Sequence, residues 1–456
     1  MRSREDDRRT APLRPLLAKE LREIAGGRAL WIMLLLTCPL IGYSFVQAVS
    51  LYVEASLGGQ QSPVLAASLS PLDGVLVPTF GALYVCVTLL FPFVAIRVVS
   101  HEKETGALSL LAQLPYASAT LVCAKLAAVM TAWLLVSVPA LSALVVWILL
   151  GGHLAPAETL DLLLGHLLYG LLVGAVALFA AAVAEGAATA AIITLAFTIG
   201  SWVLDFTVAG RPGLFDWMAR LSLTQALRTF EQGLFSAATA FAMAAAAAGF
   251  AGLAGIWLRP GAVTRVRLAR SAACVLVAAL VIGAASEVRR SIDVSEDRRN
   301  SFAPADQRAL ATLTAPLAIT VHLIPEDPRF ADLQRNILTK LERAMPRVAV
   351  QLAGGAGERD PRYGEVEYVY GGRSDVSRST SPREILPLLY ALAGVAPPAA
   401  VPGGDYPGYP LAASGELALV WFLGALPLLI LLAWGWSRRP PSLDNLLTKE
   451  VRHASG

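Results

Sequence analysis

The chain alternates between long apolar stretches and shorter polar connections. Each apolar stretch is close to the ~20 residues that a helix rising ~1.5 Å per residue needs to cross ~30 Å of hydrocarbon. Eight such stretches cover residues 31–53, 75–96, 124–150, 160–183, 187–208, 235–258, 269–285 and 417–436. The pattern predicts an all-α polytopic membrane protein with about eight transmembrane helices.

Basic side chains are concentrated on alternate connections. The segment before the first stretch carries eight lysines and arginines, whereas residues 54–73 and 151–159 carry none. The connection after the second stretch carries Arg97, Lys103 and Lys125, and the tail after the last stretch is basic again. Because short basic loops stay in the cytoplasm, we expect both termini there, in a multi-pass protein of the bacterial cytoplasmic (inner) membrane. Residues 209–234, with three arginines, are the exception among the expected outer loops.

Composition excludes an ordinary soluble domain. Hydrophobic residues make up 55% of the chain and charged residues 16%, and the mean hydropathy is +0.58. The four cysteines lie in or at the ends of apolar stretches, so neither a disulfide framework nor a metal cluster is expected. The net charge of +3 follows from the basic loops and gives no reason to expect nucleic acid as a partner.

Residues 286–415 form the one long polar segment and contain 15 basic and 16 acidic residues. Long segments translocate largely regardless of charge, so this one is expected on the outer face. Its residue pattern predicts helices at 304–313, 329–344 and 383–392, and strands at 317–324, 348–352 and 366–370. A strand, a helix and a strand in ~35 residues are enough for a parallel crossover. We therefore expect a small extracytoplasmic α/β domain, followed by a linker rich in proline and glycine at 396–410.

An amphipathic segment precedes the first span. Residues 13–24 have apolar side chains at helical spacing, with Lys19, Glu20, Arg22 and Glu23 on the opposite face. The arrangement predicts an interfacial helix, with a simple basic anchor as the alternative.

A charged turn follows the second span. It covers residues 101–106, and Leu108 and Leu111 then form an apolar stripe that ends before a proline. The pattern predicts a short amphipathic helix on the cytoplasmic surface, with a solvated turn as the alternative. A third amphipathic segment, at 214–234, is expected to close the outer end of the bundle.

No motif in the sequence indicates catalysis. The sequence contains no Gly-x-x-x-x-Gly-Lys-Ser/Thr phosphate loop, no paired-histidine metal spacing and no Gly-x-Ser-x-Gly elbow. Any dependence on ATP is therefore expected to come from another chain. A membrane-bound enzyme is the weakest of the function classes.

Ionisable side chains inside the apolar stretches are few. His166 lies within the fourth stretch, Glu185 in the turn after it and Asp205 near the outer end of the fifth. Such groups are costly in lipid and usually face a bundle interior, so His166 and Asp205 are candidates for a translocation path. The alternative places both carboxylates at headgroup level and gives His166 a hydrogen bond to a neighbouring helix.

Two of these segments resemble a known family. The first resembles the elbow helix of type-two ATP-binding-cassette (ABC) exporter permeases in the run Lys19, Glu20, Leu21, Arg22 and Glu23. The second resembles that family's Glu-x-Glu-x-Gly-Thr-Leu coupling stretch in the run Glu102, Lys103, Glu104, Thr105, Gly106, Ala107 and Leu108. Ala107 departs from the family, where threonine is more common. Six spans with this arrangement are also similar to it, so the resemblance covers residues 13–258.

A second resemblance begins after the seventh span. The auxiliary outer domain found beside gliding-motility-type exporters opens with an Asp-Leu-Thr segment, a helix and a first strand. Residues 292–303 and 316–321 resemble that opening, with Asp293 and Ser295 at matching positions. The outer segment here is shorter than in that family.

Together the resemblances imply an organisation for the whole chain. It consists of an elbow helix at 1–30, a six-span permease core at 31–258 with the coupling helix at 101–115, a basic loop and seventh span at 259–285, the outer domain and linker at 286–415, the eighth span at 416–436 and a cytoplasmic tail at 437–456.

The resemblance also implies partners. A separate ABC ATPase subunit, which uses ATP and Mg, would receive the coupling helix, and two permease copies or homologues would form a dimer in the lipid membrane. The residues implied in ATPase coupling are Glu102, Lys103, Glu104, Thr105, Gly106, Leu108 and Leu111. The expected function is ATP-driven export of a substrate that the sequence does not identify, with no cofactor on this chain. The alternative is an ATPase-driven scaffold that does mechanical work on an envelope partner through its outer domain.

Overall fold

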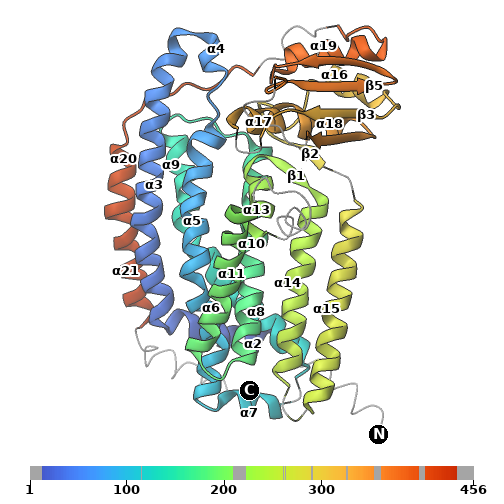
Figure 1. Ribbon diagram of the computed structural model, residues 1–456. Helices are drawn as coiled ribbons and strands as arrows, with labels where there is room; N and C mark the ends of the chain where they lie inside the picture. Colours follow the sequence, from blue (N-terminus) through green and yellow to red (C-terminus); the bar gives the residue numbers. More distant parts are fainter. Residues whose placement is uncertain are drawn as a thin grey trace, which may run out of the picture.

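The computed structural model describes residues 13–114, 116–208, 222–259, 261, 263–288, 291–324, 327–353, 361–399 and 406–438. In this part of the chain, eight helices are long and apolar enough to cross a membrane, and each coincides with one of the predicted stretches. The chain is therefore a mainly helical, multi-pass membrane protein. Figure 1 shows these helices as one bundle with a sheet-containing segment at one end.

The spanning helices include several that are built from consecutive shorter elements. In chain order they are α3 (Arg28–Gln61), η2 with α5 and α6 (Leu72–Leu76, Val77–Leu89, Phe91–Glu104), α8 with α9 (Ser118–Val136, Val138–Leu149), α10 (Pro156–Val183), α11 (Ala187–Val208), α14 (Ala237–Trp257), α15 (Thr264–Ser286) and α20 with η4 and α21 (Glu416–Val420, Trp421–Ala425, Leu426–Ser437). The short helices are α2 (Leu13–Gly26), α4 (Pro63–Ala66), α7 (Ala107–Gln113) and α13 (Leu223–Glu231). Helix α13 lies in the predicted amphipathic segment at 214–234, of which residues 214–221 are outside the described part.

Two spans are interrupted next to a proline. Pro92 lies in the first turn of α6 and Pro139 in the first turn of α9. Proline has no N–H to donate to the carbonyl four residues earlier, so that carbonyl needs another partner inside a membrane. For Pro92 this is the carbonyl of Thr88, which accepts a hydrogen bond from Thr198 Oγ1 of α11 at 3.4 Å. The interruption is thereby joined to a neighbouring span.

Helix α10 is the centre of the bundle and contacts α6, α8, α11, α13 and α14 (Figure 1). Glycines permit this close packing. A β-carbon at Gly165 would lie 2.5 Å from Phe230, and one at Gly170 would lie 2.2 Å from Trp133. Small residues let helices approach closely in a membrane, where packing replaces the hydrophobic effect as the driving force. Helix α15 is the opposite case, because Ala285 is the one buried residue among its described positions.

Residues 291–395 contain a four-stranded sheet with its own hydrophobic core, which we call the sheet unit. Its strands are β3 (Leu317–Val321), β4 (Val348–Leu352), β5 (Val366–Tyr370) and β6 (Arg373–Ser377), in the order β4-β3-β5-β6. Strands β3 and β4 are parallel, and the other two neighbouring pairs are antiparallel. The helices are α16 (Pro304–Ala311), the continuous run α17, η3 and α18 (Pro328–Leu333, Gln334–Leu338, Thr339–Ala344), and α19 (Pro382–Ala393).

Most elements of the sheet unit agree with the sequence pattern. Strands β4 and β5 have the predicted bounds, whereas the strand predicted at 317–324 ends at Val321. The helix predicted at 329–344 includes a π-helical turn, η3. The pattern does not predict strand β6, because this mostly exposed edge strand has the polar sequence Arg-Ser-Asp-Val-Ser.

A small two-stranded sheet joins the bundle to the sheet unit. Strand β1 (Leu234–Ser236) precedes α14, and β2 (Ser291–Asp293) follows α15; they pair antiparallel from Leu234 opposite Asp293 to Ser236 opposite Ser291. Figure 1 shows this junction at the end of the bundle opposite to α7.

Candidate functional site

The α7 end of the bundle contains a buried group of charges. Lys125 Nζ of α8 donates hydrogen bonds to Glu20 Oε1 of α2 at 2.9 Å, to Glu102 Oε2 of α6 at 2.6 Å and to the Val98 carbonyl at 3.0 Å. Glu20, Glu102 and Lys125 are all buried. One ammonium group therefore joins three segments that are far apart in the sequence.

Two further residues of α2 complete this group, which we call the ionic cluster: Lys19, Glu20, Glu23, Glu102 and Lys125. Lys19 forms ion pairs with Glu102, with Glu23 at 3.2 Å and with Glu20 at 3.5 Å. Burial raises the pKa of the Glu20 carboxyl. Burial acts to lower the pKa of Lys19, but the carboxylates of Glu102, Glu20 and Glu23 outweigh it, so that pKa is raised.

The three carboxylates of the ionic cluster approach one another closely enough to resemble a metal site. One oxygen from each of Glu20, Glu23 and Glu102 lies within 4.8 Å of the others. The ammonium groups of Lys19 and Lys125 already contact these oxygens, so lysines supply the compensating positive charge. We assign no metal to this position.

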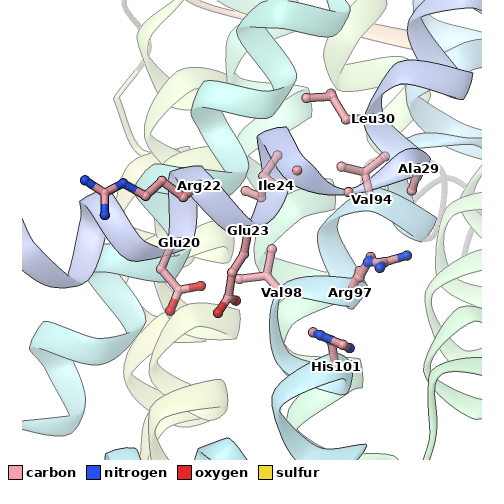
Figure 2. A pocket seen from close by; sticks show the side chains of 12 residues that line it. Glu20, Arg22, Glu23, Ile24, Ala29, Leu30, Val94, Arg97, Val98 and His101 are labelled. Carbon is pink, nitrogen blue, oxygen red and sulfur yellow. The ribbon is translucent and has the colours of Figure 1, made fainter. Parts of the chain in front are cut away.

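A cavity of about 290 Å³ adjoins the ionic cluster. It lies between α2, the start of α3 and α6, and Figure 2 shows Glu20 and Glu23 on α2 across from Arg97 and His101 on α6. Glu20 Oε2 is buried and has no hydrogen-bond partner among the described residues. The cavity thus has charged side chains of both signs on its α2 side, basic side chains from α6 opposite them, and apolar walls from α3 and α6.

The position of Glu20 corrects one detail of the sequence pattern. Helix α2 is amphipathic as predicted, and Leu16 is buried against Leu121 and Ala124. Arg22 is exposed and Leu21 is half-buried. The helical pattern places Glu20 on the solvent face, but it is buried, because Lys125 supplies a partner that a pattern within α2 does not reveal.

The residues implied in ATPase coupling lie together at the α6–α7 turn, but they differ in environment. Glu102 is buried in the ionic cluster. Lys103 Nζ donates to the carbonyls of Ala182 and Ala184 at 2.7 and 2.9 Å, which satisfies the end of α10. Both side chains are therefore bonded to their own chain.

The tip of the turn is open to solvent. Glu104 and Thr105 are exposed, and Gly106 has φ +75°, a left-handed conformation that lets the chain turn sharply into α7. Leu108 and Leu111 pack inward against the bundle, so the predicted apolar stripe faces this protein. The exposed apolar side chains of this region are Leu110, at 66% exposure, and Leu114, at 48%.

The structure describes the side chain of one of the two proposed path residues, His166. His166 is buried in α10, with Nε2 3.4 Å from Glu231 Oε1 of α13 and its ring 5.1 Å from that of Phe80. Asp205 belongs to α11, and its side chain lies outside the described residues.

Sequence reasoning missed Asp161 inside a span and counted Lys125 with the basic connection after the second span. Asp161 is buried in α10, and neither of its carboxylate oxygens has a hydrogen-bond partner among the described residues. Lys125 is fully buried at the centre of the ionic cluster. Both lie within apolar stretches at 124–150 and 160–183, and charged residues there are signals of a functional or structural role.

A second polar group holds the bundle to the sheet unit at the opposite end. We call it the junction cluster: His153, Glu158, Glu296, Arg299 and Tyr409. The Glu296 N–H donates to Glu158 at 3.1 Å, and its carboxylate contacts His153 at 2.9 Å and accepts from the Tyr409 hydroxyl. This last hydrogen bond raises the pKa of Tyr409 to about 12. Arg299 pairs with Asp73 at the start of the second span.

The loop after β2 is organised by one carboxylate. Asp293 Oδ1 accepts from the N–H and hydroxyl of Ser295, and Oδ2 accepts from the Asn300 N–H at 3.1 Å and the Ser301 hydroxyl at 2.6 Å. These are residues of the segment that resembles the opening of an auxiliary outer domain. Their spacing produces a closed loop at the junction.

Comparisons of the chain with family models, with curated proteins and with solved structures found no match.

Proposed function

We propose that the chain is the transmembrane permease subunit of an ABC-type exporter, driven by a separate ATPase subunit that binds the α6–α7 turn on the cytoplasmic side. One observation carries the proposal: an exposed turn extends from α6, and the base of that turn is held by the ionic cluster to α2 and α8. The resemblance of both segments to elbow and coupling elements gives the same assignment.

The connections at this turn suit the transmission of movement. A displacement of α7 acts on α6, on α2 and α8 through Lys125, and on the end of α10 through Lys103. Packed helices move as rigid bodies with discrete arrangements, so a force at the turn would shift these segments together. ATP and Mg would be held by the ATPase, and a second permease copy would supply the other half of the path.

The turn residues fall into two groups, those that would contact the ATPase and those that would position the turn. Glu104, Thr105, Leu110 and Leu114 are exposed and would contact the ATPase. Glu102 and Lys103 would position the turn from inside. A charge reversal at Glu102 would disrupt the buried ionic cluster and is therefore unsuitable as a test of partner binding.

The test is co-purification of the tagged full chain with its candidate ATPase, followed by ATP hydrolysis in lipid. We expect Glu104→Arg with Leu110→Asp to abolish association with the ATPase or to reduce ATP hydrolysis at least tenfold. A central interface contact contributes ~1.4 kcal/mol or more, and its loss weakens binding by that factor. The matched control is Glu384→Arg, an exposed glutamate of the sheet unit. Unchanged association and hydrolysis in the double variant would remove the coupling assignment.

A second candidate function is an ATPase-driven scaffold that acts on an envelope partner through an extracytoplasmic α/β domain. The junction cluster favours it, because both segments that connect the sheet unit to the bundle are bonded to spans. The segment before the sheet unit contacts Asp73 and Glu158, and the segment after it contacts Tyr52 and Ser56 of α3. Such bracing would transmit movement of the bundle to the sheet unit.

Replacing residues 304–399 by a flexible Gly/Ser linker separates the two candidates, because it retains the loop at 291–301 and Tyr409. A scaffold predicts normal ATP hydrolysis with loss of the cellular function. An exporter whose path lies in the bundle predicts that export continues.

A further inference from the structure

We propose that a basic groove at the α7 end of the bundle binds the phosphate of an anionic phospholipid. The groove has a volume of about 430 Å³ and lies between the α6–α7 turn and the α14–α15 connection. Its cationic side chains are Lys103, Arg259 and Arg267, and its apolar walls include Leu108, Trp257 and Leu258. This inference does not depend on the proposed ATPase.

The charge of the groove is of one sign. Three cations line it together with apolar and small residues, and no acidic residue of the described part of the chain does. Within the described residues, none of the three forms an ion pair with an acidic side chain. Cations gathered without a counter-charge attract an anion, and planar guanidinium groups match the oxygens of a phosphate.

The cations are held in position by the protein. Arg267 Nη2 donates to the Arg259 carbonyl at 2.6 Å, and the guanidinium lies 5.8 Å from the centre of the Trp257 ring. Arg267 Nε is buried and has no hydrogen-bond partner among the described residues. Lys103 is held by the carbonyls at the end of α10. A preorganised site of this kind loses little side-chain entropy when the anion binds.

The depth of the groove and its surroundings favour a lipid over a soluble anion. Helix α6 ends at Glu104, α14 ends at Trp257 and α15 begins at Thr264, so the groove lies at the level where spans leave the hydrocarbon. Tryptophan is enriched at that level. Beyond the groove, α15 exposes apolar side chains such as Leu268 and Val275 at 56% and 54%, which give acyl chains a surface to contact. The positive-inside rule predicts this end to be cytoplasmic, where anionic lipids attract basic segments.

The experiment measures lipid retained by the purified full chain, using intact-protein mass measurement and binding of labelled phosphatidylglycerol in detergent. We expect Arg259→Gln with Arg267→Gln to weaken phosphatidylglycerol binding about tenfold or more, since each charge contributes separately. The matched control is Arg265→Gln with Arg270→Gln, which removes two exposed arginines of α15 that lie outside the groove. The control is expected to change binding less than threefold, roughly the scatter of surface charge effects.

Further comparisons make the result decisive. Arg259→Lys with Arg267→Lys keeps the charge but loses the guanidinium geometry, and we expect it to bind phosphatidylglycerol more tightly than the glutamine variant and less tightly than the wild type. Equal losses in the groove and control variants would mean diffuse attraction by a basic surface and would overturn the site. Equal affinity for phosphatidylcholine would overturn it as well. Glycerol 3-phosphate serves as the soluble competitor of labelled phosphatidylglycerol. If it binds with the same affinity as the lipid, the groove binds a free phosphate ester and the lipid assignment is wrong.

Discussion

Lys125 Nζ lies 2.6 Å from Glu102 Oε2, and both side chains are buried where three segments of the chain meet. Burying an ion pair costs desolvation energy that its attraction only partly repays, so such a pair adds little net stability. It does specify which side chains must face one another. We interpret the pair, with Glu20, as a device that fixes α2 and α8 in register with α6.

Removing the central ammonium group tests this interpretation. Lys125→Met removes the fully buried ammonium group that bonds Glu20 and Glu102 and leaves the half-exposed Lys19 as the partner of both carboxylates. We expect it to lower the free energy of unfolding by about 3–5 kcal/mol. Denaturant unfolding of the full chain in detergent measures the loss. Adding Glu20→Gln and Glu102→Gln to Lys125→Met should recover much of it, because no uncompensated charge then remains. Arg22→Met, on the exposed face of α2, is the control; equal stability of Lys125→Met and this control would contradict the interpretation.

Close packing of α10 gives a second prediction. A β-carbon at Gly170 would lie 2.2 Å from Trp133 Nε1, so Gly170→Ala forces two spans apart. We expect a loss of about 1–3 kcal/mol, the usual cost of overpacking, measured as a lower thermal midpoint. A β-carbon at Gly200 of α11 would meet no described atom within 4 Å, so Gly200→Ala should cost nothing and gain slightly from helix propensity. Similar midpoints for the two variants would show that α10 has room to adjust.

The spans were predictable because their signal is local. A run of ~20 apolar residues predicts a membrane helix whatever it packs against, and the described spans agree with those runs. The same holds for β4 and β5, whose apolar side chains and flanking breaks mark them within the sequence. Strands β1 and β2 have three residues each and pair across more than fifty positions, so no local pattern reveals them.

The candidate site was predictable in place but not in detail. The charged run at Glu102 and the helix at Glu20 are visible in the sequence, yet its pattern places both glutamates on the surface. A helical pattern reports one face of one helix, whereas the burial of these residues depends on Lys125, more than twenty positions further along. The apolar stripe of α7 is a similar case. Residues of α2 and α8 pack against Leu111 on the inner face of the helix, and Leu110 is the leucine that is exposed.

Asp327 gives a prediction of pH dependence in the sheet unit. Its carboxylate caps α17 and accepts hydrogen bonds from Arg329, with Nη2 at 2.8 Å, and from the Tyr363 hydroxyl at 2.7 Å. The hydrogen bonds from Arg329, followed by that from Tyr363, lower the pKa of Asp327 well below its ordinary value of 3.8. The ionised form therefore stabilises the folded state at pH values above about 4, and this contribution is lost as the pH falls further towards the folded-state pKa.

We accordingly expect Asp327→Asn to lower the thermal midpoint of the sheet unit at pH 7, with a difference from the wild type that narrows below pH 4. Thermal unfolding at pH 7 and at about pH 3 measures both values. Asp332→Asn, an exposed aspartate in the same helix, is the control. A difference that stays constant over this pH range would show that the ionised carboxylate is not what stabilises the helix start.

The Asp293 loop gives the last prediction, on the connection between the bundle and the sheet unit. Five groups from Ser295, Asn300 and Ser301 donate to this one carboxylate, and the Asn300 side chain also donates to the Gln232 carbonyl next to β1. Hydrogen bonds to a charged acceptor contribute ~1.5–3 kcal/mol each, but most of these donors can turn to water when the loop opens. We therefore expect Asp293→Ala to lower the free energy of opening the loop by about 2 kcal/mol. Amide exchange over residues 291–301 would then be roughly thirtyfold faster.

Hydrogen exchange of the full chain in detergent distinguishes a local loop from a structural connection. If the loop only closes on itself, faster exchange in Asp293→Ala will be confined to 291–301. If it holds the junction, exchange at Leu234 and Phe235 of β1 will rise as well, because the pairing with β2 depends on the same segment. We expect the second result, since Asp293 is both the last paired residue of β2 and the acceptor that closes the loop. Asp306→Ala, which removes a carboxylate bonded to Tyr390 within the sheet unit, should leave exchange in β1 unchanged.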